Sequence, residues 1–292
     1  MLAPFAQWWT SDLAQEIHEN LRGREGNHEM TSLVQWPILS SSRQRQRRRL
    51  VDKMVNICER ADLLERTVHS AVLYIDKFIA ITNLQDTHVH LAALAAILVA
   101  AKYHEREENI PAIAVLNTIS AQHFSASHVQ SMELILLDCL EWNLGEPTIM
   151  SFIEYYMIQT VHPDDYHCDQ PLGNVDKARK YVKKYAQYFL QICLQEYELR
   201  MYVPSCTAAA VIAAIRSCLC LAPTWPKRLE TTTGYQTPQI AHCVHKMLLI
   251  HDEDRQATEK EKILTASKAT TMTTTAETVA AMLTCITAVQ AS

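Results

Sequence analysis

Residues 91–103, with the sequence LAALAAILVAAKY, constrain the fold more than any other stretch of the chain. The stretch is apolar on every side of a helix and carries a single charged residue, Lys102, near its end. A helix that is hydrophobic all round must lie inside a protein or a bilayer, and this one is shorter than the roughly 20 residues that a membrane span needs. We therefore predict that it is the central helix of a helical domain, with Lys102 at the edge of the core.

The composition favours helices around a large buried core. Only 5 of the 292 residues are glycine and 10 are proline, whereas 48% are hydrophobic and 20% are charged. This balance is typical of a mostly helical protein with short connections. The net charge of -5 gives no general attraction to nucleic acids or acidic membranes. We therefore expect no membrane association and disfavour a nucleic-acid partner.

The nine cysteines are scattered and lie mostly in apolar helical contexts, a pattern typical of buried free thiols in a reducing compartment. The closest pair, Cys218 and Cys220, has the wrong spacing for a zinc knuckle.

The sequence contains no Gly-x-Ser-x-Gly, no glycine-rich phosphate loop and no His-Glu-x-x-His motif. We therefore predict no catalytic residues, no metal site and no cofactor, and hence a protein that is not an enzyme.

Two acidic residues, Asp76 and Glu133, stand in strongly apolar helical segments and need partners there. For Asp76 we expect a structural ion pair with one of the arginines at 47–49. For Glu133 two interpretations stay open. It forms an internal ion pair with Lys102, or the two charges stay at the surface and bind backbone groups of another protein, Lys102 as donor and Glu133 as acceptor.

A basic run, RQRQRRR, occupies residues 43–49 at the start of a predicted helix. Such a run can be a nuclear-import signal or a nucleic-acid patch. We favour the solvated face of a helix. For the protein as a whole we expect an intracellular location, in the nucleus or the cytoplasm, with the nucleus favoured.

Helical periodicity and turn formers divide the chain into domains. Gly145-Glu146-Pro147 is a natural break, and the small apolar segment 206–215 repeats the character of 91–103. We expect residues 161–174 to be a polar surface loop rather than a metal site. The predicted domains are 1–42, an N-terminal helix and linker; 43–145 and 146–254, two helical bundles; and 255–292, a flexible Thr/Ala-rich tail. The predicted helices after the basic run are 65–81, 91–103, 111–119, 127–144, 148–160, 175–200, 206–220, 225–232 and 238–250.

Five residues carry a resemblance to a known family. They follow one another in order and with near-family spacing, and the segments around them, such as YIDKF at 74–78 and WNL at 142–144, fit as well. The five residues are Arg47, Asp76, Leu91, Lys102 and Glu133. Through them the sequence resembles the cyclin box. The resemblance implies an all-α fold of two tandem five-helix bundles, each around a buried central helix, preceded by an N-terminal helix.

Further segments resemble the cyclin J group of that family, and together they cover about residues 5–255. They are QWW at 7–9, SFIEYY at 151–156, PTWPKRL at 223–229 and LLIHD at 248–252.

The resemblance implies a regulatory subunit that binds and activates a cyclin-dependent serine/threonine kinase in cell-cycle control. Lys102, Glu133 and Leu91 would contact the kinase, and Arg47 with Asp76 would form the structural salt bridge of the box. Substrates or inhibitors of the kinase are further possible partners.

The docking groove of the family departs from its usual pattern here. In cell-cycle cyclins an apolar set on the first helix binds Arg-x-Leu motifs. The matching positions in this chain are Gln46, Arg49, Leu50 and Lys53, of which three are polar or basic. Such a surface cannot bury the leucine of that motif, and we expect it to attract acidic or phosphorylated partners instead.

Two alternatives to kinase activation stay open. The same fold can serve as a scaffold for transcription or nucleic-acid complexes, for which the basic run at 43–49 is the support. It can also bind a kinase without activating it.

Overall fold

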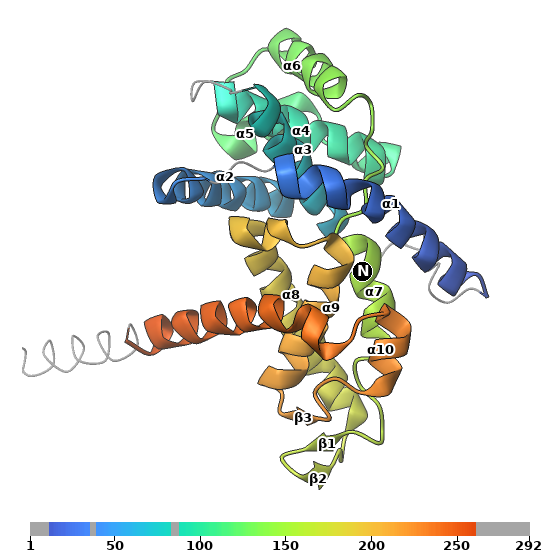
Figure 1. Cartoon of the computed structure of the whole chain (residues 1–292). Helices are drawn as coiled ribbons and strands as arrows, with labels where there is room; N and C mark the ends of the chain where they lie inside the picture. Colours follow the sequence, from blue (N-terminus) through green and yellow to red (C-terminus); the bar gives the residue numbers. More distant parts are fainter. Residues whose placement is uncertain (1–11, 36–38, 83–87, 261–292) are drawn as a thin grey trace, which may run out of the picture. The chain divides into compact units, whose positions relative to one another are not determined.

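The computed structural model describes residues 12–35, 39–82 and 88–260, and most of them are helical (Figure 1). The predicted all-α fold is confirmed. Residues up to Val244 form one compact unit that holds both helical bundles, and the residues from His245 onward belong to a second unit. In the part of the chain that the model describes, no helix is both long and apolar enough to cross a membrane.

The first bundle consists of five helices, with α4 at its centre. Its central helix buries every residue from Ala92 to Ala101, and α3 and α6 pack along it (Figure 1). The alanines let these neighbours approach closely, and each buried leucine or isoleucine contributes roughly 1.5–3 kcal/mol. The helices are α2 (Ser41–Arg60), α3 (Glu65–Thr82), α4 (Val89–His104), α5 (Ile113–Ser120) and α6 (Ala126–Cys139), with a short η3 (Glu107–Asn109) between α4 and α5.

The second bundle repeats this plan around α9 (Pro204–Cys218), which is buried from Ser205 to Arg216. Both α7 and α8 pack against it. The other elements are α7 (Met150–Met157), α8 (Val175–Gln195), η4 (Tyr197–Met201), α10 (Lys227–Thr233) and a last helix over 237–260. Residues 255–260, which we expected in the tail, therefore continue a helix, and the rest of the expected tail lies outside the described residues.

Much of the linker that we expected within residues 1–42 is helical, because α1 (Ala14–Gln35) continues to Gln35. Tertiary contacts hold this helix. Arg22 donates to the carbonyl of Thr233 at 2.7 Å, and the Glu25 carboxylate accepts from the backbone N–H of Ser205 at 2.6 Å. These contacts offset the roughly 1 kcal/mol that an interior glycine such as Gly23 costs a helix. Within α1, His18 is buried and hydrogen-bonds Tyr156, whereas Leu13, directly before the helix, is exposed.

The segment 161–174 is not the plain polar surface loop that we expected. It contains the strands β1 (Tyr166–His167) and β2 (Gln170–Pro171), and β1 also pairs with β3 (Leu221–Ala222), so the strand order is β2-β1-β3. Both pairings are antiparallel.

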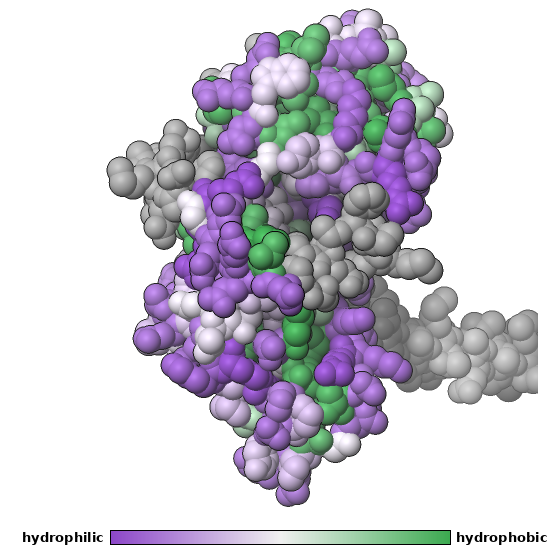
Figure 2. Space-filling model, turned by 90° about the vertical axis from the view of Figure 1, so that its right-hand side faces the viewer, coloured by the Kyte–Doolittle hydropathy of each residue, from purple (hydrophilic) through white to green (hydrophobic). Residues whose placement is uncertain are grey.

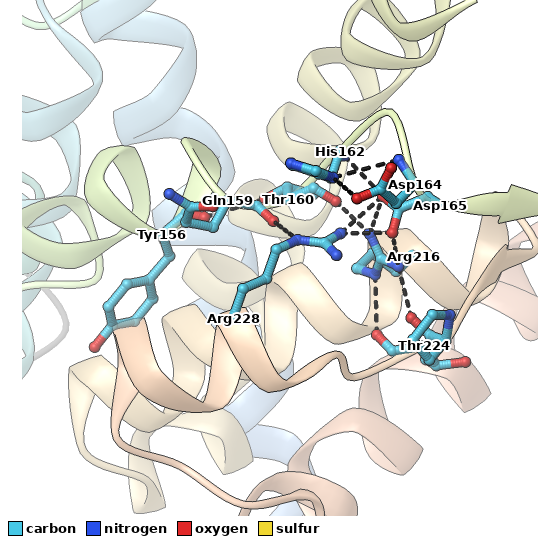
Figure 3. A network of polar contacts seen from close by, with 10 residues as sticks. Tyr156, Gln159, Thr160, His162, Asp164, Asp165, Arg216, Thr224 and Arg228 are labelled. Atoms are coloured by element: carbon cyan, nitrogen blue, oxygen red, sulfur yellow. Dashed lines mark hydrogen bonds and ion pairs between the residues drawn. The ribbon is translucent and has the colours of Figure 1, made fainter. Parts of the chain in front are cut away.

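Asp165, at the start of this segment, is buried between two arginines (Figure 3). Arg216 pairs with both of its carboxylate oxygens, at 2.9 and 3.0 Å, and Arg228 approaches the same oxygens at 2.6 and 2.8 Å. Burial by itself would raise the pKa of Asp165, but the hydrogen bonds from the two arginines outweigh it and hold that pKa below its usual value. The loop is therefore anchored by a buried ion pair to α9 and α10.

Candidate functional site

Lys102 and Glu133 meet at the surface between α4 and α6. The Lys102 Nζ lies 2.5 Å from the Glu133 Oε1, and the lysine side chain is 49% exposed while the glutamate side chain is 10% exposed. The expected ion pair forms, but it faces solvent on its lysine side; binding of a partner's backbone groups stays a prediction. Since an ammonium has three N–H donors, Lys102 can hold Glu133 and still donate to a partner.

Large apolar side chains are exposed on the same two helices and just after α6. Tyr103 follows Lys102 and is 50% exposed, Leu134 follows Glu133 and is 57% exposed, and Trp142 is 62% exposed. On α6 the buried residues include Met132, Glu133, Leu136 and Leu137, so Leu134 falls on the opposite face. We call these five residues, Lys102, Tyr103, Glu133, Leu134 and Trp142, the α4/α6 surface.

Exposed aromatic side chains beside a charged pair are typical of protein–protein contact sites rather than of an ordinary solvated surface. In Figure 2, hydrophobic side chains are exposed among polar ones over the first bundle, in the upper part of the view. Lys102 and Glu133 could be singled out from the sequence as site residues, whereas the three apolar members were not. Their position outside the buried face of the helices is the signal that could have found them.

Tyr103 is held against the connection between the bundles. A Cβ added to Gly145 would lie 2.9 Å from the Tyr103 Oη and 3.1 Å from Nη2 of Arg24, which itself donates to the Gly145 carbonyl. The absence of a side chain at residue 145 therefore allows α1, the end of α4 and the connection to converge.

Arg47 and Asp76 form the structural ion pair that we predicted. The Arg47 Nε and Nη2 donate to the two carboxylate oxygens of Asp76, each at 2.8 Å, and both side chains are buried. Arg200 of η4 donates to the same carboxylate at 2.5 Å, and Arg47 donates to the carbonyl of Gln195 at 2.9 Å. The pair therefore does more than support the first bundle from within, because it also binds the second.

The charges around Asp76 decide its protonation. Burial by itself would raise the pKa of Asp76, but the neighbouring Arg47 and Arg200 and their hydrogen bonds outweigh it and hold this pKa below its usual value. The carboxylate is therefore ionised at neutral pH and keeps both arginines in place.

The altered docking-groove positions lie on α2. Gln46, Arg49 and Lys53 are exposed and Leu50 is buried. Leu50 and Lys53 line a pocket of about 320 Å³ between α2, α4 and α5, together with His90 of α4. Partial burial and the charge of Lys53 lower the pKa of His90 below its usual value. The pocket is thus lined by apolar residues together with polar and charged ones, among them Lys53 and Asp52.

Leu91 is half-buried and packs against the core of the first bundle. Its contact with a kinase stays a prediction. Among the described residues, no group of three or more His, Cys, Asp or Glu side chains is placed to hold a metal ion.

Two tandem helical bundles, each around a buried central helix, together with an Arg–Asp pair at their junction and an exposed Lys–Glu pair, define a protein of the tandem cyclin-box class. Comparison with known proteins agrees. The model of the cyclin N-terminal domain matches residues 16–145, and the model of the cyclin C-terminal domain matches residues 147–282. The chain belongs to the cyclin family, whose members are regulatory subunits rather than enzymes.

The predicted similarity to cyclin J is confirmed. The chain is 33% identical to Cyclin-J of Xenopus laevis over 262 residues, which cover 87% of this chain and 66% of that protein. It is 34% identical to Cyclin-J of Homo sapiens, over 88% of this chain and 66% of that protein. The chain thus spans about two thirds of the length of these relatives.

Solved structures support the fold. The structure of a viral cyclin from herpesvirus saimiri matches with a TM-score of 0.61 at 15% identity, over 79% of this chain and 94% of that one. A chain in the structure of the CAK complex from Chaetomium thermophilum bound to ATP-gamma-S matches with a TM-score of 0.53 at 10% identity, over 85% of this chain and 80% of that one.

Proposed function

We propose that this protein is the regulatory subunit of a cyclin-dependent serine/threonine kinase, which it binds and activates in cell-cycle control, and that it is not itself an enzyme. The observation that carries the proposal is the α4/α6 surface, which combines a half-exposed Lys102–Glu133 pair with exposed Tyr103, Leu134 and Trp142 on or directly after the same two helices. A nuclear location is part of the same proposal.

The chemistry of this surface suits the end of a partner helix. The apolar side chains would be desolvated by the partner, and the ion pair would bind main-chain groups that a helix leaves without partners at its ends. Lys102 would donate to carbonyls, and Glu133 would accept from N–H groups. Hydrogen bonds to charged groups are stronger than those between neutral groups, so they would fix the orientation of the docked helix.

Activation would follow from selective binding. A kinase is active when the glutamate of its C-helix pairs with the lysine that positions ATP. A subunit that binds only this arrangement shifts the kinase toward it by as much as the affinities for the two states differ. A shift from 1:99 to 99:1 requires about 10⁴-fold tighter binding to the active state.

The nucleic-acid alternative has little support in the basic run. Arg47 is buried on Asp76, and Arg48 pairs with Glu196 at 2.7 Å, so two of its arginines are engaged within the protein. A salt-dependent shift of labelled duplex DNA would favour this alternative over ours.

The test is co-purification of the full chain with candidate cyclin-dependent kinases, followed by an assay of kinase activity. Lys102→Ala/Glu133→Ala is expected to lose both binding and activation while it remains folded. The matched control is Lys227→Ala/Glu230→Ala, which removes an exposed Lys–Glu pair with a 2.9 Å contact in the second bundle. The proposal fails if the first double variant binds and activates as well as the wild type, and binding without activation would identify a scaffold.

A further inference from the structure

Cys168 and Cys220 lie opposite one another at the end of the small sheet. The β1–β3 register pairs Tyr166 with Ala222 and His167 with Leu221, so Cys168 and Cys220 occupy the next position of the ladder. The backbone N–H of Cys168 donates to the carbonyl of Cys220 with an N–O distance of 3.4 Å. The two cysteines are 52 positions apart along the chain, and the fold brings them together.

The ladder geometry suits a covalent bond between them. Residues directly opposite in an antiparallel ladder have Cα atoms about 4.5–5.5 Å apart, which lies inside the range of about 4.4–6.8 Å that disulfides span. The Cys220 thiol also lies near enough to Cys168 to raise its pKa. A disulfide would therefore need little movement of the backbone.

Cys168 also occupies an unusual position in the chain. It forms, with Asp169, the two-residue loop of the β1–β2 hairpin, and their φ angles are 49° and 63°. Positive φ at both loop residues is typical of a type I′ turn, for which Asn-Gly or Asp-Gly is preferred. Cys220, also at a φ of 49°, directly precedes β3. Cysteine is not a preferred residue at either of these positive-φ positions.

The remaining described cysteines have less access to solvent. Cys168 and Cys220 are exposed, whereas Cys58, Cys193, Cys206 and Cys243 are buried and Cys139 and Cys218 are half-buried. Burial raises the pKa of Cys58 to about 12 and that of Cys206 to about 11, so these thiols are unreactive at neutral pH. Among the cysteines that the structure describes, the paired ones are the most accessible to an oxidant.

We propose that Cys168 and Cys220 are a reversible oxidation site, at which a peroxide converts the two thiols into a disulfide that ties the β1–β2 hairpin to the end of α9. One thiolate attacks a peroxide oxygen, the O–O bond breaks, and a sulfenic acid and water form. The second sulfur then attacks the sulfenic sulfur, the S–O bond breaks, and a second water leaves as the S–S bond forms. Two electrons and two protons pass from the thiols to the peroxide, and a dithiol reductant reverses the reaction.

The rate should depend on pH. Desolvation, the adjacent Cys220 thiol and Asp169 raise the pKa of Cys168 above its usual value, so little thiolate is present at neutral pH. Oxidation is therefore expected to accelerate as the pH rises. The site lies in the second bundle and does not include the α4/α6 surface, so it does not depend on the proposed kinase activation.

The test treats the native full chain with hydrogen peroxide and maps its disulfides by mass spectrometry without reduction. We expect a 168–220 cross-link, a loss of two titratable thiols and full reversal by dithiothreitol. Cys168→Ser and Cys220→Ser should each abolish the cross-link and leave a sulfenic acid that dimedone traps on the remaining cysteine. Cys218→Ser is the matched control, and it should retain the cross-link.

A cross-link through Cys218 or through Cys285, which lies outside the described residues, would overturn the proposal. So would a 168–220 link that forms only in denaturant or between two chains, or a chain in which both thiols remain reduced after other cysteines have been oxidised. Because kinase binding is measured separately, its failure would leave this result unaffected.

Discussion

Arg47 of α2 and Asp76 of α3 are joined by two hydrogen bonds of 2.8 Å in the buried junction between the bundles. The same carboxylate accepts from Arg200, 124 residues further along the chain, and Arg47 reaches the carbonyl of Gln195. One carboxylate therefore holds two arginines from different bundles, and its removal would take the counter-charge from the buried Arg47 and the partly buried Arg200.

Asp76→Asn is therefore expected to destabilise the protein strongly. Removing one partner of a buried ion pair typically costs about 3–5 kcal/mol, because the other charge stays buried. The measurement is urea-induced unfolding followed by circular dichroism. Arg48→Ala is the control, because the Arg48–Glu196 pair is largely exposed and such pairs contribute about 0–1 kcal/mol. Equal losses for the two variants would contradict this account of the junction.

Acid should destabilise the protein through His18. Burial, followed by the nearby charge of Arg22, lowers the pKa of His18 to about 4, and its Nε2 lies 2.9 Å from the Tyr156 Oη. Between that value and the unfolded pKa of about 6.5, the unfolded chain binds a proton that the folded chain does not. Stability should therefore fall as the pH drops from about 6.5 to about 4, by on the order of 3 kcal/mol from this residue.

The check is a series of urea titrations across that pH range. His18→Gln is expected to reduce the loss of stability on acidification. His128→Gln, which replaces an exposed histidine of α6, should leave the curve unchanged because that ring is in water in both states. An identical pH dependence for the wild type and His18→Gln would exclude His18 as a source of acid sensitivity.

Local sequence patterns predict much of the fold. The uniform apolar character of 91–103 predicts a buried helix, and α4 is buried from Ala92 to Ala101. A carboxylate among apolar residues needs a basic partner, because burying an unpaired charge is costly. This argument predicts that one of the arginines at 47–49 lies beside Asp76. In both cases the relevant information lies within a few helical turns or follows from the cost of burying a charge.

Other features depend on contacts that no local pattern encodes. Asp165 in a polar segment looks the same in the sequence whether it is solvated or buried, and its partner Arg216 is 51 residues away. The continuation of α1 through Gly23 depends on Arg22 and Glu25 meeting the second bundle. At the candidate site, periodicity could not choose between a pair in the interior and a pair at the surface, because Lys102 and Glu133 lie at the boundary.

Trp142→Ala tests whether the α4/α6 surface binds the kinase. An exposed tryptophan at the centre of an interface commonly contributes about 2 kcal/mol or more to binding, so affinity should fall by about 30-fold or more. Stability should hardly change, because the side chain is mostly in solvent. Binding is measured by biolayer interferometry with the purified kinase. Tyr181→Ala, at an exposed aromatic of α8, is the control, and equal effects of both variants would place the interface elsewhere.

The basic groove on α2 should select acidic peptides over Arg-x-Leu peptides. Lys53 lines its pocket and Arg49 is exposed on the same helix, whereas Asp52, which also lines the pocket, already accepts from Gln195. The arginine of an Arg-x-Leu motif would therefore meet a net like charge. A phosphorylated peptide would instead pair its phosphate with Lys53 and Arg49. We expect its affinity to fall as salt is added, because the groups involved are exposed.

Fluorescence anisotropy with labelled peptides checks this selection. Lys53→Glu is expected to weaken binding of the phosphorylated peptide by about tenfold, which corresponds to about 1.4 kcal/mol. Lys183→Glu makes the same charge change at an exposed position of α8 and should leave the affinity nearly unchanged, which separates a local contact from a general effect of net charge. Tighter binding of an unphosphorylated Arg-x-Leu peptide than of the acidic one would show that the groove works as in other cyclins, despite its altered residues.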